Sequence, residues 1–173
     1  MNETLKTLLN RRSIRKYKTN QIKDEELKAI LEAGMYAPSA AGQQSAKFIV
    51  VQDKETLKKI DAMNAKVMGK DVHPYYGAPT VILVLADKSK VAPVEDASVA
   101  LANMFNAAAS LGLGSCWIHR EKQMFESEEG KNLLKEWGIE GDYIGVGSCA
   151  LGYPDCPKSE VAPRKGDYVV YIR

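Results

Sequence analysis

Long hydrophobic runs are scarce in this chain of 173 residues. Its main apolar stretch, Val81–Ala86, is far shorter than the roughly 20 residues that a membrane-spanning helix requires. The first residues, Met1–Lys6, lack the cationic start and the apolar run of a secretory signal. We therefore expect no membrane association and a cytoplasmic location.

An excess of one charge is also lacking, because 24 basic residues nearly balance 22 acidic ones. A net charge of +2 does not favour a nucleic acid or a membrane surface as the partner. Cysteine is sparse as well: Cys116, Cys149 and Cys156 form no C-x-x-C pair of the kind found in zinc or dithiol sites. We expect reduced thiols, with Cys116 and Cys149 buried, and no metal site.

What is present fits one globular domain over residues 1–173, with 45% hydrophobic and 27% charged residues. The hydrophobic spacing predicts a first helix that contains Leu5, Leu8 and Leu9, and a second that starts at an N-cap near Asp24 and stops at Pro38. It predicts three more helices, at Lys54–Met68, Glu95–Leu111 and Glu128–Trp137. It predicts strands at Lys47–Gln52, Thr80–Ala86, Ser115–Ile118, Tyr143–Leu151 and Tyr168–Ile172. This mixture indicates a layered α+β (α/β) fold.

The first candidate site is Arg11–Lys16, in which four cations and the hydroxyl of Ser13 follow the first predicted helix. A guanidinium group matches phosphate oxygens with two parallel hydrogen bonds, and a serine hydroxyl can add another. The segment thus has the chemistry of a phosphate clamp. A solvated basic face or a weak nucleic-acid patch would have the same composition.

A second candidate is Ala37–Gln44, a run of small and amide residues between a helix and a strand. Small side chains let a flat ligand approach the backbone, and amides can bind ring heteroatoms. An ordinary polar turn is the alternative. A further candidate follows Gly152-Tyr153-Pro154, where Arg164 and Lys165 either join the N-terminal cations around one anion or form a cationic surface loop.

The remaining candidate is Gly112–Arg120, a glycine-rich turn that leads into a strand and ends at His119 and Arg120. It is not a dinucleotide fingerprint, because its glycines end a helix and open a strand and the third glycine is missing. His119 is either a general acid or base or an incidental exposed histidine.

Taken in order, these segments resemble the nitroreductase family of FMN-dependent oxidoreductases. The resemblance rests on R-R-S-I-R-K-Y near the start, A-P-S-A-A-G-Q-Q before a strand, L-G-L-G-S-C-W-I after the alanine-rich helix and A-L-G-Y-P near the end. It spans nearly the whole chain. It implies a central, mostly antiparallel sheet flanked by helices and an intertwined homodimer with FMN at the subunit interface.

The resemblance also implies roles for particular residues. Arg11, Arg12 and Ser13 match the family's phosphate and ribityl segment, and Arg15 matches a cation at the pyrimidine edge of the flavin. The segment that the partner subunit lays against the ring corresponds to Pro38, Ser39 and Ala40, with Gln43 or Gln44 at the amide position. Backbone N–H groups near flavin N5 correspond to Trp117, Ile118, His119 and Arg120, and Arg164 and Lys165 would close the phosphate site.

Two departures from the family pattern bear on substrate choice. Many relatives have small residues where this chain has His119-Arg120, which makes the pocket mouth narrower or more cationic. A proline and an aromatic residue commonly follow the glutamine, whereas Ser45-Ala46 stand here.

The implied activity is ping-pong transfer of hydride from NADH or NADPH to flavin N5, and then to a nitro compound, a quinone or a similar acceptor. Because a flavin performs such chemistry itself, no catalytic side chain is required. The alternatives are a flavoenzyme of the same fold with another task, such as dehalogenation or flavin destruction, and a non-catalytic module that binds a phosphate ligand.

Overall fold

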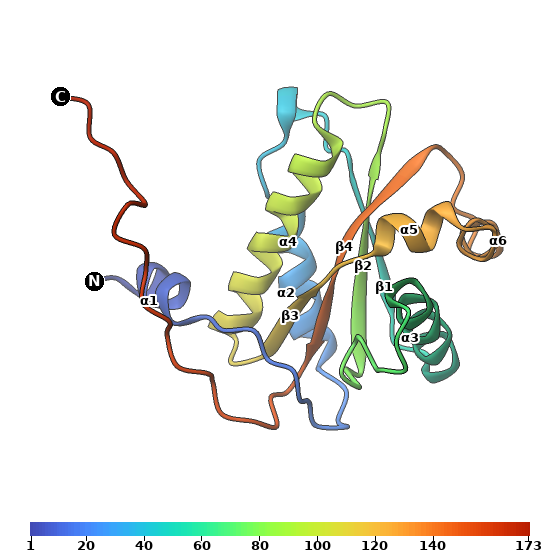
Figure 1. Cartoon of the computed structure of the whole chain (residues 1–173), viewed down its shortest axis with the longest axis horizontal. Helices are drawn as coiled ribbons and strands as arrows, with labels where there is room; N and C mark the ends of the chain where they lie inside the picture. Colours follow the sequence, from blue (N-terminus) through green and yellow to red (C-terminus); the bar gives the residue numbers. More distant parts are fainter.

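A four-stranded sheet forms the centre of the protein in a computed structural model that describes residues 1–173 (Figure 1). The strands are β1 (Ala46–Val51), β2 (Thr80–Asp87), β3 (Gly114–Ile118) and β4 (Tyr143–Gly152). Their order across the sheet is β1-β2-β4-β3, and every adjacent pair is antiparallel. The predicted mostly antiparallel sheet is therefore confirmed.

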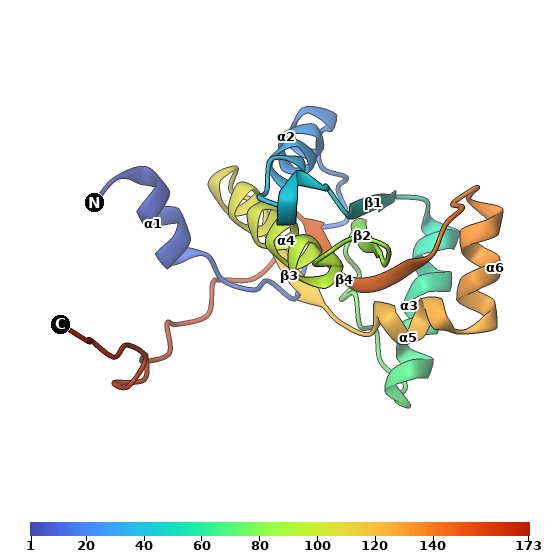
Figure 2. The same ribbon diagram turned by 90° about the horizontal axis from the view of Figure 1, so that it is seen from above.

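Helices cover both faces of this sheet (Figure 2). They are α1 (Glu3–Asn10), α2 (Asp24–Met35), α3 (Lys54–Met68), α4 (Pro93–Ser110), α5 (Glu121–Glu126), α6 (Glu128–Glu136) and the 3₁₀ helix η1 (Ala40–Gly42). Side chains of α2 and α4 pack on one face, and those of α3, α5 and α6 pack on the other. Helix α1 and the C-terminal tail project from the body on the same side in both views.

The central strand β2 shows why the sheet has a core on each face. Successive side chains of a strand point to opposite faces. Val81, Leu83 and Leu85 accordingly join the core under α3 and α5, whereas Ile82 and Val84 join the core under α4. All five side chains are fully buried, so the continuous apolar run of β2 contributes side chains to the hydrophobic cores on both faces of the sheet.

Local signals place several element boundaries where the sequence predicts them. Helix α3 spans Lys54–Met68 as predicted: the Asp53 carboxylate accepts from Thr56 N at 2.8 Å, and Gly69 follows with φ 66°. Helix α4 spans Pro93–Ser110, so it starts two residues before the predicted Glu95 and ends one residue before the predicted Leu111; Gly112, whose φ of 76° favours glycine, follows its end.

Two expectations are corrected, and one helix is added. Asp24 is the first residue of α2 rather than its N-cap, and the backbone N–H of Lys23 donates to Glu26 Oε2 at 2.9 Å. Helix α5 was not predicted: its N-cap residue, Arg120, makes no side-chain capping hydrogen bond, so its six residues carry no local start signal. The predicted strand at Tyr168–Ile172 is wrong for the single chain: this exposed segment has no neighbouring strand to take its backbone hydrogen bonds.

No helix is both long enough and apolar enough to cross a membrane. Cys116 and Cys149 are buried and all three cysteines are free thiols.

Candidate functional site

The N-terminal cationic segment lies along the outer edge of β3. Ser13 forms a parallel bridge with Ser115, and the N–H of Ile14 donates to Ser115 O at 2.9 Å. Gly114 permits this approach, since an added Cβ would lie 2.9 Å from the Ile14 side chain. The glycine-rich turn before β3 therefore has a packing role that brings the first and third candidate segments together.

Two guanidinium groups at this edge have no acidic partner. Neither Arg11 nor Arg15 makes an ion pair within the chain, which the structure describes throughout. Burial raises the pKa of the nearby Cys116 thiol, and the positive charge of Arg15 opposes that rise, as does Ser13 beside it. Two uncompensated cations and a hydroxyl are the donor set that a phosphate group needs.

The Arg12 side chain, unlike those of Arg11 and Arg15, is bound to backbone carbonyl oxygens of its own chain. Its Nη1 donates to the carbonyl oxygens of Leu9, at 2.8 Å, and of Arg11. These are carbonyls at the C-terminal end of α1, where a cation also compensates the helix dipole. In the single chain Arg12 therefore caps a helix.

The small-residue segment Pro38–Gln44 lies at the opposite end of α4. The Asp96 carboxylate, in the first turn of α4, accepts from Ala40 N and from Ser45 Oγ, each at 2.8 Å. Ser115 follows the other end of this 18-residue helix, which is about 27 Å long at 1.5 Å per residue. One chain thus carries the two halves of the predicted site far apart.

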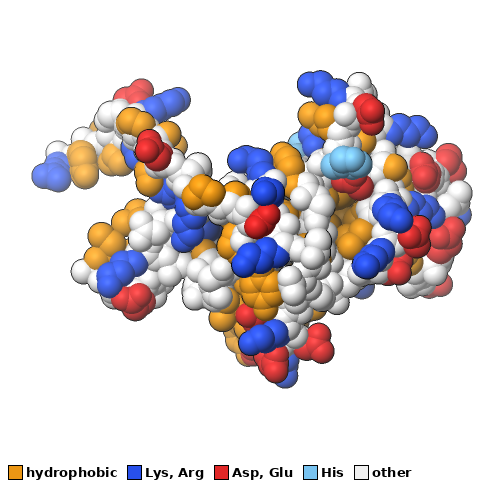
Figure 3. Space-filling model, turned by 90° about the horizontal axis from the view of Figure 1, so that it is seen from below, with side chains coloured by type: hydrophobic (Ala, Val, Ile, Leu, Met, Phe, Trp, Pro, Cys, Tyr) orange, Lys and Arg blue, Asp and Glu red, His pale blue; other side chains and the backbone are white.

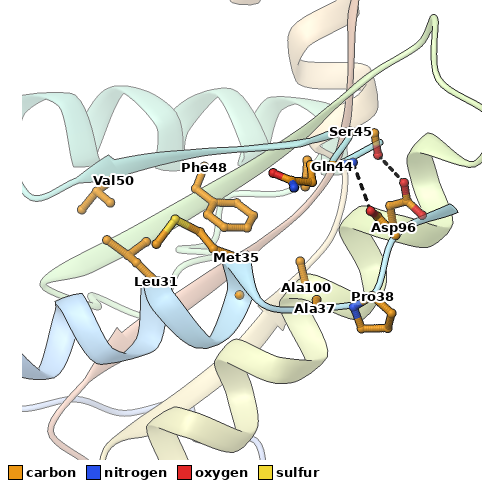
Figure 4. Close-up of a pocket in the computed structure, with 13 residues that line it drawn as sticks. Leu31, Met35, Ala37, Pro38, Gln44, Ser45, Phe48, Val50, Asp96 and Ala100 are labelled. Carbon is orange, nitrogen blue, oxygen red and sulfur yellow. Dashed lines mark hydrogen bonds between the residues drawn. The ribbon is translucent and has the colours of Figure 1, made fainter. Parts of the chain in front are cut away.

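A cavity of about 470 Å³ adjoins this second segment (Figure 4). Apolar side chains of α2 and β1 line it, among them Leu31, Met35 and Phe48. Gln44 also lines it, with its φ of 49° stabilised by the bond from its N–H to Ser39 Oγ. Gln43 instead uses its amide oxygen to accept from Val91 N at 3.0 Å, so Gln44 is the amide that lines the cavity.

The far end of β3 carries the remaining ring-contact candidates. Trp117 is 37% exposed and packs against Phe105, with a ring-centroid distance of 5.9 Å. Ile118 is buried, and His119 is exposed. Arg120, the N-cap residue of α5, has a left-handed backbone, φ 88° and ψ 3°. This conformation is uncommon for a residue with a side chain.

Sequence reasoning missed the buried polar residues behind this end of β3. Glu121 is fully buried and accepts from Ser148 Oγ at 2.7 Å and from Tyr75 OH at 3.0 Å. Burial raises its pKa to about 7, against the opposing hydrogen bonds from these two hydroxyls. Asn64, also fully buried, contacts both His119 and Arg120. Hydrophobic periodicity predicts which apolar residues of α3 are buried, but it does not indicate that a polar residue such as Asn64 is buried.

Arg164 and Lys165 lie on the exposed tail and are not brought to Arg11 within the chain. The guanidinium of Arg164 donates only to Ala162 O, at 2.9 Å. The tail leaves the body next to the N-terminal segment, where Lys18 N donates to Tyr153 O. Figure 3 shows a notch between the tail and α1, with Lys and Arg side chains where these two arms meet the body and hydrophobic side chains along the arms.

The fold places the candidate segments of a small α+β domain at two separate positions. The cationic segment, with the donor set of a phosphate site, lies beside the start of β3, and the segment of small and amide residues lies at the other end of α4.

The chain belongs to the nitroreductase family, whose sequence model matches residues 8–155. A relative from Archaeoglobus fulgidus, named as an NADH dehydrogenase or NAD(P)H nitroreductase, is 39% identical over 160 residues, which cover 89% of this chain and 87% of that protein. A relative from Methanothermobacter thermautotrophicus with the same name is also 39% identical, over 88% of this chain and 78% of its own length.

Solved structures agree with this assignment. The nitroreductase of Bacteroides fragilis with bound FMN has a TM-score of 0.90 and 30% identity, covering 99% of this chain and 100% of that one. The nitroreductase of Desulfitobacterium hafniense with bound FMN has a TM-score of 0.88 and 29% identity, covering 100% of both chains. The nitroreductase-like fold expected from the sequence is thus confirmed.

Proposed function

We propose that the protein is an FMN-dependent NAD(P)H oxidoreductase that passes electrons to a nitro compound, a quinone or a similar acceptor. The observation that carries this proposal is the pair of unneutralised guanidinium groups, Arg11 and Arg15, beside Ser13 at the edge of β3. Family membership and the FMN bound in similar structures support the same cofactor here.

The chain's own residues bind and orient the flavin. Arg11 and Ser13 hold the phosphate and the ribityl chain, with Arg12 as a further candidate, and Arg15 approaches the pyrimidine edge. A cation at that edge offsets the negative charge that develops on reduction. Backbone N–H groups of Trp117–Arg120 face the reactive part of the ring.

A flavin bound here would supply the chemistry of hydride transfer at N5, for a ping-pong reaction of NAD(P)H and the acceptor. The protein's contribution is to keep one ring face open to both reactants. No side chain of the site is required as a nucleophile or a general base.

We further propose a homodimer in which each flavin lies between the two subunits. The partner supplies Pro38, Ser39 and Ala40 with Gln43 or Gln44, because these residues lie at the wrong end of α4 to meet Arg11 of the same chain. Arg164 and Lys165 lie on the projecting tail that completes the phosphate site. Exposed apolar side chains on both arms support burial against a partner; they are Leu5, Leu8, Leu9, Val169, Val170, Tyr171 and Ile172.

The function is tested on the purified full-length protein. We expect a yellow protein with flavin absorbance, whose colour bleaches on addition of NADH or NADPH and returns on addition of a nitroarene or a quinone. Turnover of halogenated phenols or destruction of the flavin would assign another task to the same fold. A colourless protein that takes up no FMN would overturn the proposal in favour of a phosphate-binding module.

The dimer is tested with one exposed valine on the tail. Val170→Lys places a charge among apolar tail residues, and we expect it to shift the protein from twice its 19.1 kDa chain mass toward the monomer and to lower FMN content. Light scattering after size-exclusion chromatography measures the mass. Val72→Lys, at an exposed valine between α3 and β2, is the control. A Val170→Lys protein that stays dimeric with full flavin content would contradict this role of the tail.

A further inference from the structure

The peptide that joins β3 to α5 has a backbone conformation that its own residue disfavours. Arg120 has φ 88° and ψ 3°, a region that glycine adopts freely and that other residues rarely occupy. Such a conformation persists only where surrounding contacts determine it, and it is concentrated at functional sites. The chain places it directly after His119, at the end of β3.

The Asn64 side chain supplies those contacts. Its Nδ2 donates to the backbone oxygen of His119 at 2.9 Å, and its Oδ1 accepts from Arg120 Nε at 2.8 Å. The orientation of the amide is unambiguous, because the opposite orientation would face oxygen with oxygen and donor with donor. Asn64 is fully buried in α3, so a rigid helix holds both ends of this short peptide.

Further contacts hold the next residue in place. The backbone of Glu121 packs so closely on β4 that a Cβ added to Gly145 would lie 2.3 Å from Glu121 O. The Glu121 carboxylate accepts from Ser148 and Tyr75, and Tyr75 OH lies 3.5 Å from Asn64 Nδ2. The polar network is thus continuous from Arg120 through Asn64 to Glu121.

We propose that Asn64 is a positioning residue of the flavin site. Its amide binds the His119 carbonyl and the Arg120 side chain and so holds Arg120 in its left-handed conformation, which keeps the backbone N–H groups at the end of β3 in the places from which they act on the reactive part of the flavin. This inference rests on the proposed function. It adds Asn64, a fully buried residue of α3, to the determinants of flavin reactivity.

The test compares Asn64→Leu with Gln52→Leu in the full-length protein loaded with FMN. Gln52 is a matched control: its half-buried amide donates to Thr80 Oγ1 at 3.0 Å, at the other end of the sheet. We expect Asn64→Leu to slow flavin reduction by NAD(P)H about tenfold or more and to move the flavin reduction potential to more negative values. FMN affinity should change less than about threefold, because the cationic segment beside β3 is unaltered.

A second variant separates positioning from general stability. Glycine adopts φ 88° without strain, so a glycine at position 120 no longer needs the Asn64 contacts. We therefore expect the flavin of the double variant Asn64→Leu/Arg120→Gly to be reduced faster than the sum of the two single-variant effects on the rate predicts. Additive effects in this double-mutant cycle would overturn the proposal. So would an Asn64→Leu protein with the reduction rate and potential of the Gln52→Leu control.

A measurement on the flavin-free protein keeps the two proposals distinguishable. Backbone amides of residues 119–121 should exchange hydrogen faster in Asn64→Leu than in Gln52→Leu, and equal rates would refute the role of Asn64 whatever the cofactor is. If the exchange differs but no variant binds FMN, the proposed function fails instead. Should Asn64→Leu not fold, Asn64→Asp keeps the acceptor for Arg120 and removes the donor to His119 O, with the same expected slowing and the same contradicting result.

Discussion

Replacing Arg15 with alanine is expected to weaken FMN binding by about 10- to 100-fold and to slow reduction of the flavin that remains bound. The side chain is exposed, has no acidic partner and lies beside the Ser13 and Cys116 edge of β3. A hydrogen bond to a charged group contributes about 1.5–3 kcal/mol, which gives the expected range. Flavin fluorescence titration measures the affinity, and stopped-flow absorbance measures the reduction.

The comparison with Arg12→Ala sharpens this prediction. The Arg12 guanidinium already donates to two carbonyls at the end of α1, so its loss should reduce helix stability more than FMN affinity. Arg11→Ala should resemble Arg15→Ala in affinity. Unchanged flavin content and an unchanged reduction rate in Arg15→Ala would refute the assignment of this segment.

Replacing Glu121 with glutamine is expected to remove a large part of the pH dependence of stability. Burial raises the pKa of Glu121 from 4.5 to about 7 in the folded protein. The folded state therefore binds the proton more tightly than the unfolded chain does. The resulting stabilisation is complete below about pH 4.5 and is lost as the pH rises through 7, with a total change of about 3 kcal/mol.

Urea unfolding at several pH values between 4 and 8 measures this effect. The difference in unfolding free energy between Glu121→Gln and the unchanged protein should shift in favour of the variant as the pH rises, because glutamine carries no charge to bury. Glu126→Gln, at an exposed position of the same helix, is the control and should follow the unchanged protein. A difference for Glu121→Gln that does not vary with pH would contradict the prediction.

Much of the fold was predictable because its signals are local. The Asp53 cap and Gly69 bound α3, Pro93 starts α4, and Gly112 follows its end. The apolar run of β2 predicted a buried strand. Helix α5 escaped prediction because its existence depends on packing against Gly145 of β4 and on Gly130, where a Cβ would lie 2.0 Å from Met124 O.

Part of the candidate site was likewise predictable from the sequence and part was not. The motifs at Arg11–Arg15, Pro38–Gln44 and Gly112–Arg120 were visible in the sequence, as was their likeness to one family, which the comparisons confirm. The buried partners that hold them were not visible. Asp96 and Asn64 come from helices that are distant in the sequence from the segments they bind.

The sequence by itself determined the secondary structure in outline, the mixed α+β fold and the residue types of the candidate phosphate-binding and ring-binding segments, since caps, hydrophobic periodicity and donor chemistry are properties of neighbouring residues. Only the tertiary structure decided how those residues are arranged. It separated the two candidate segments by the length of α4 and directed the Arg12 guanidinium to carbonyl oxygens at the end of α1. It left Tyr168–Ile172 without a strand partner. It also buried Glu121 and Asn64 next to Arg120, which has a left-handed backbone. The physical reason is that such contacts join residues far apart in the chain, and each depends on packing that local propensities do not encode.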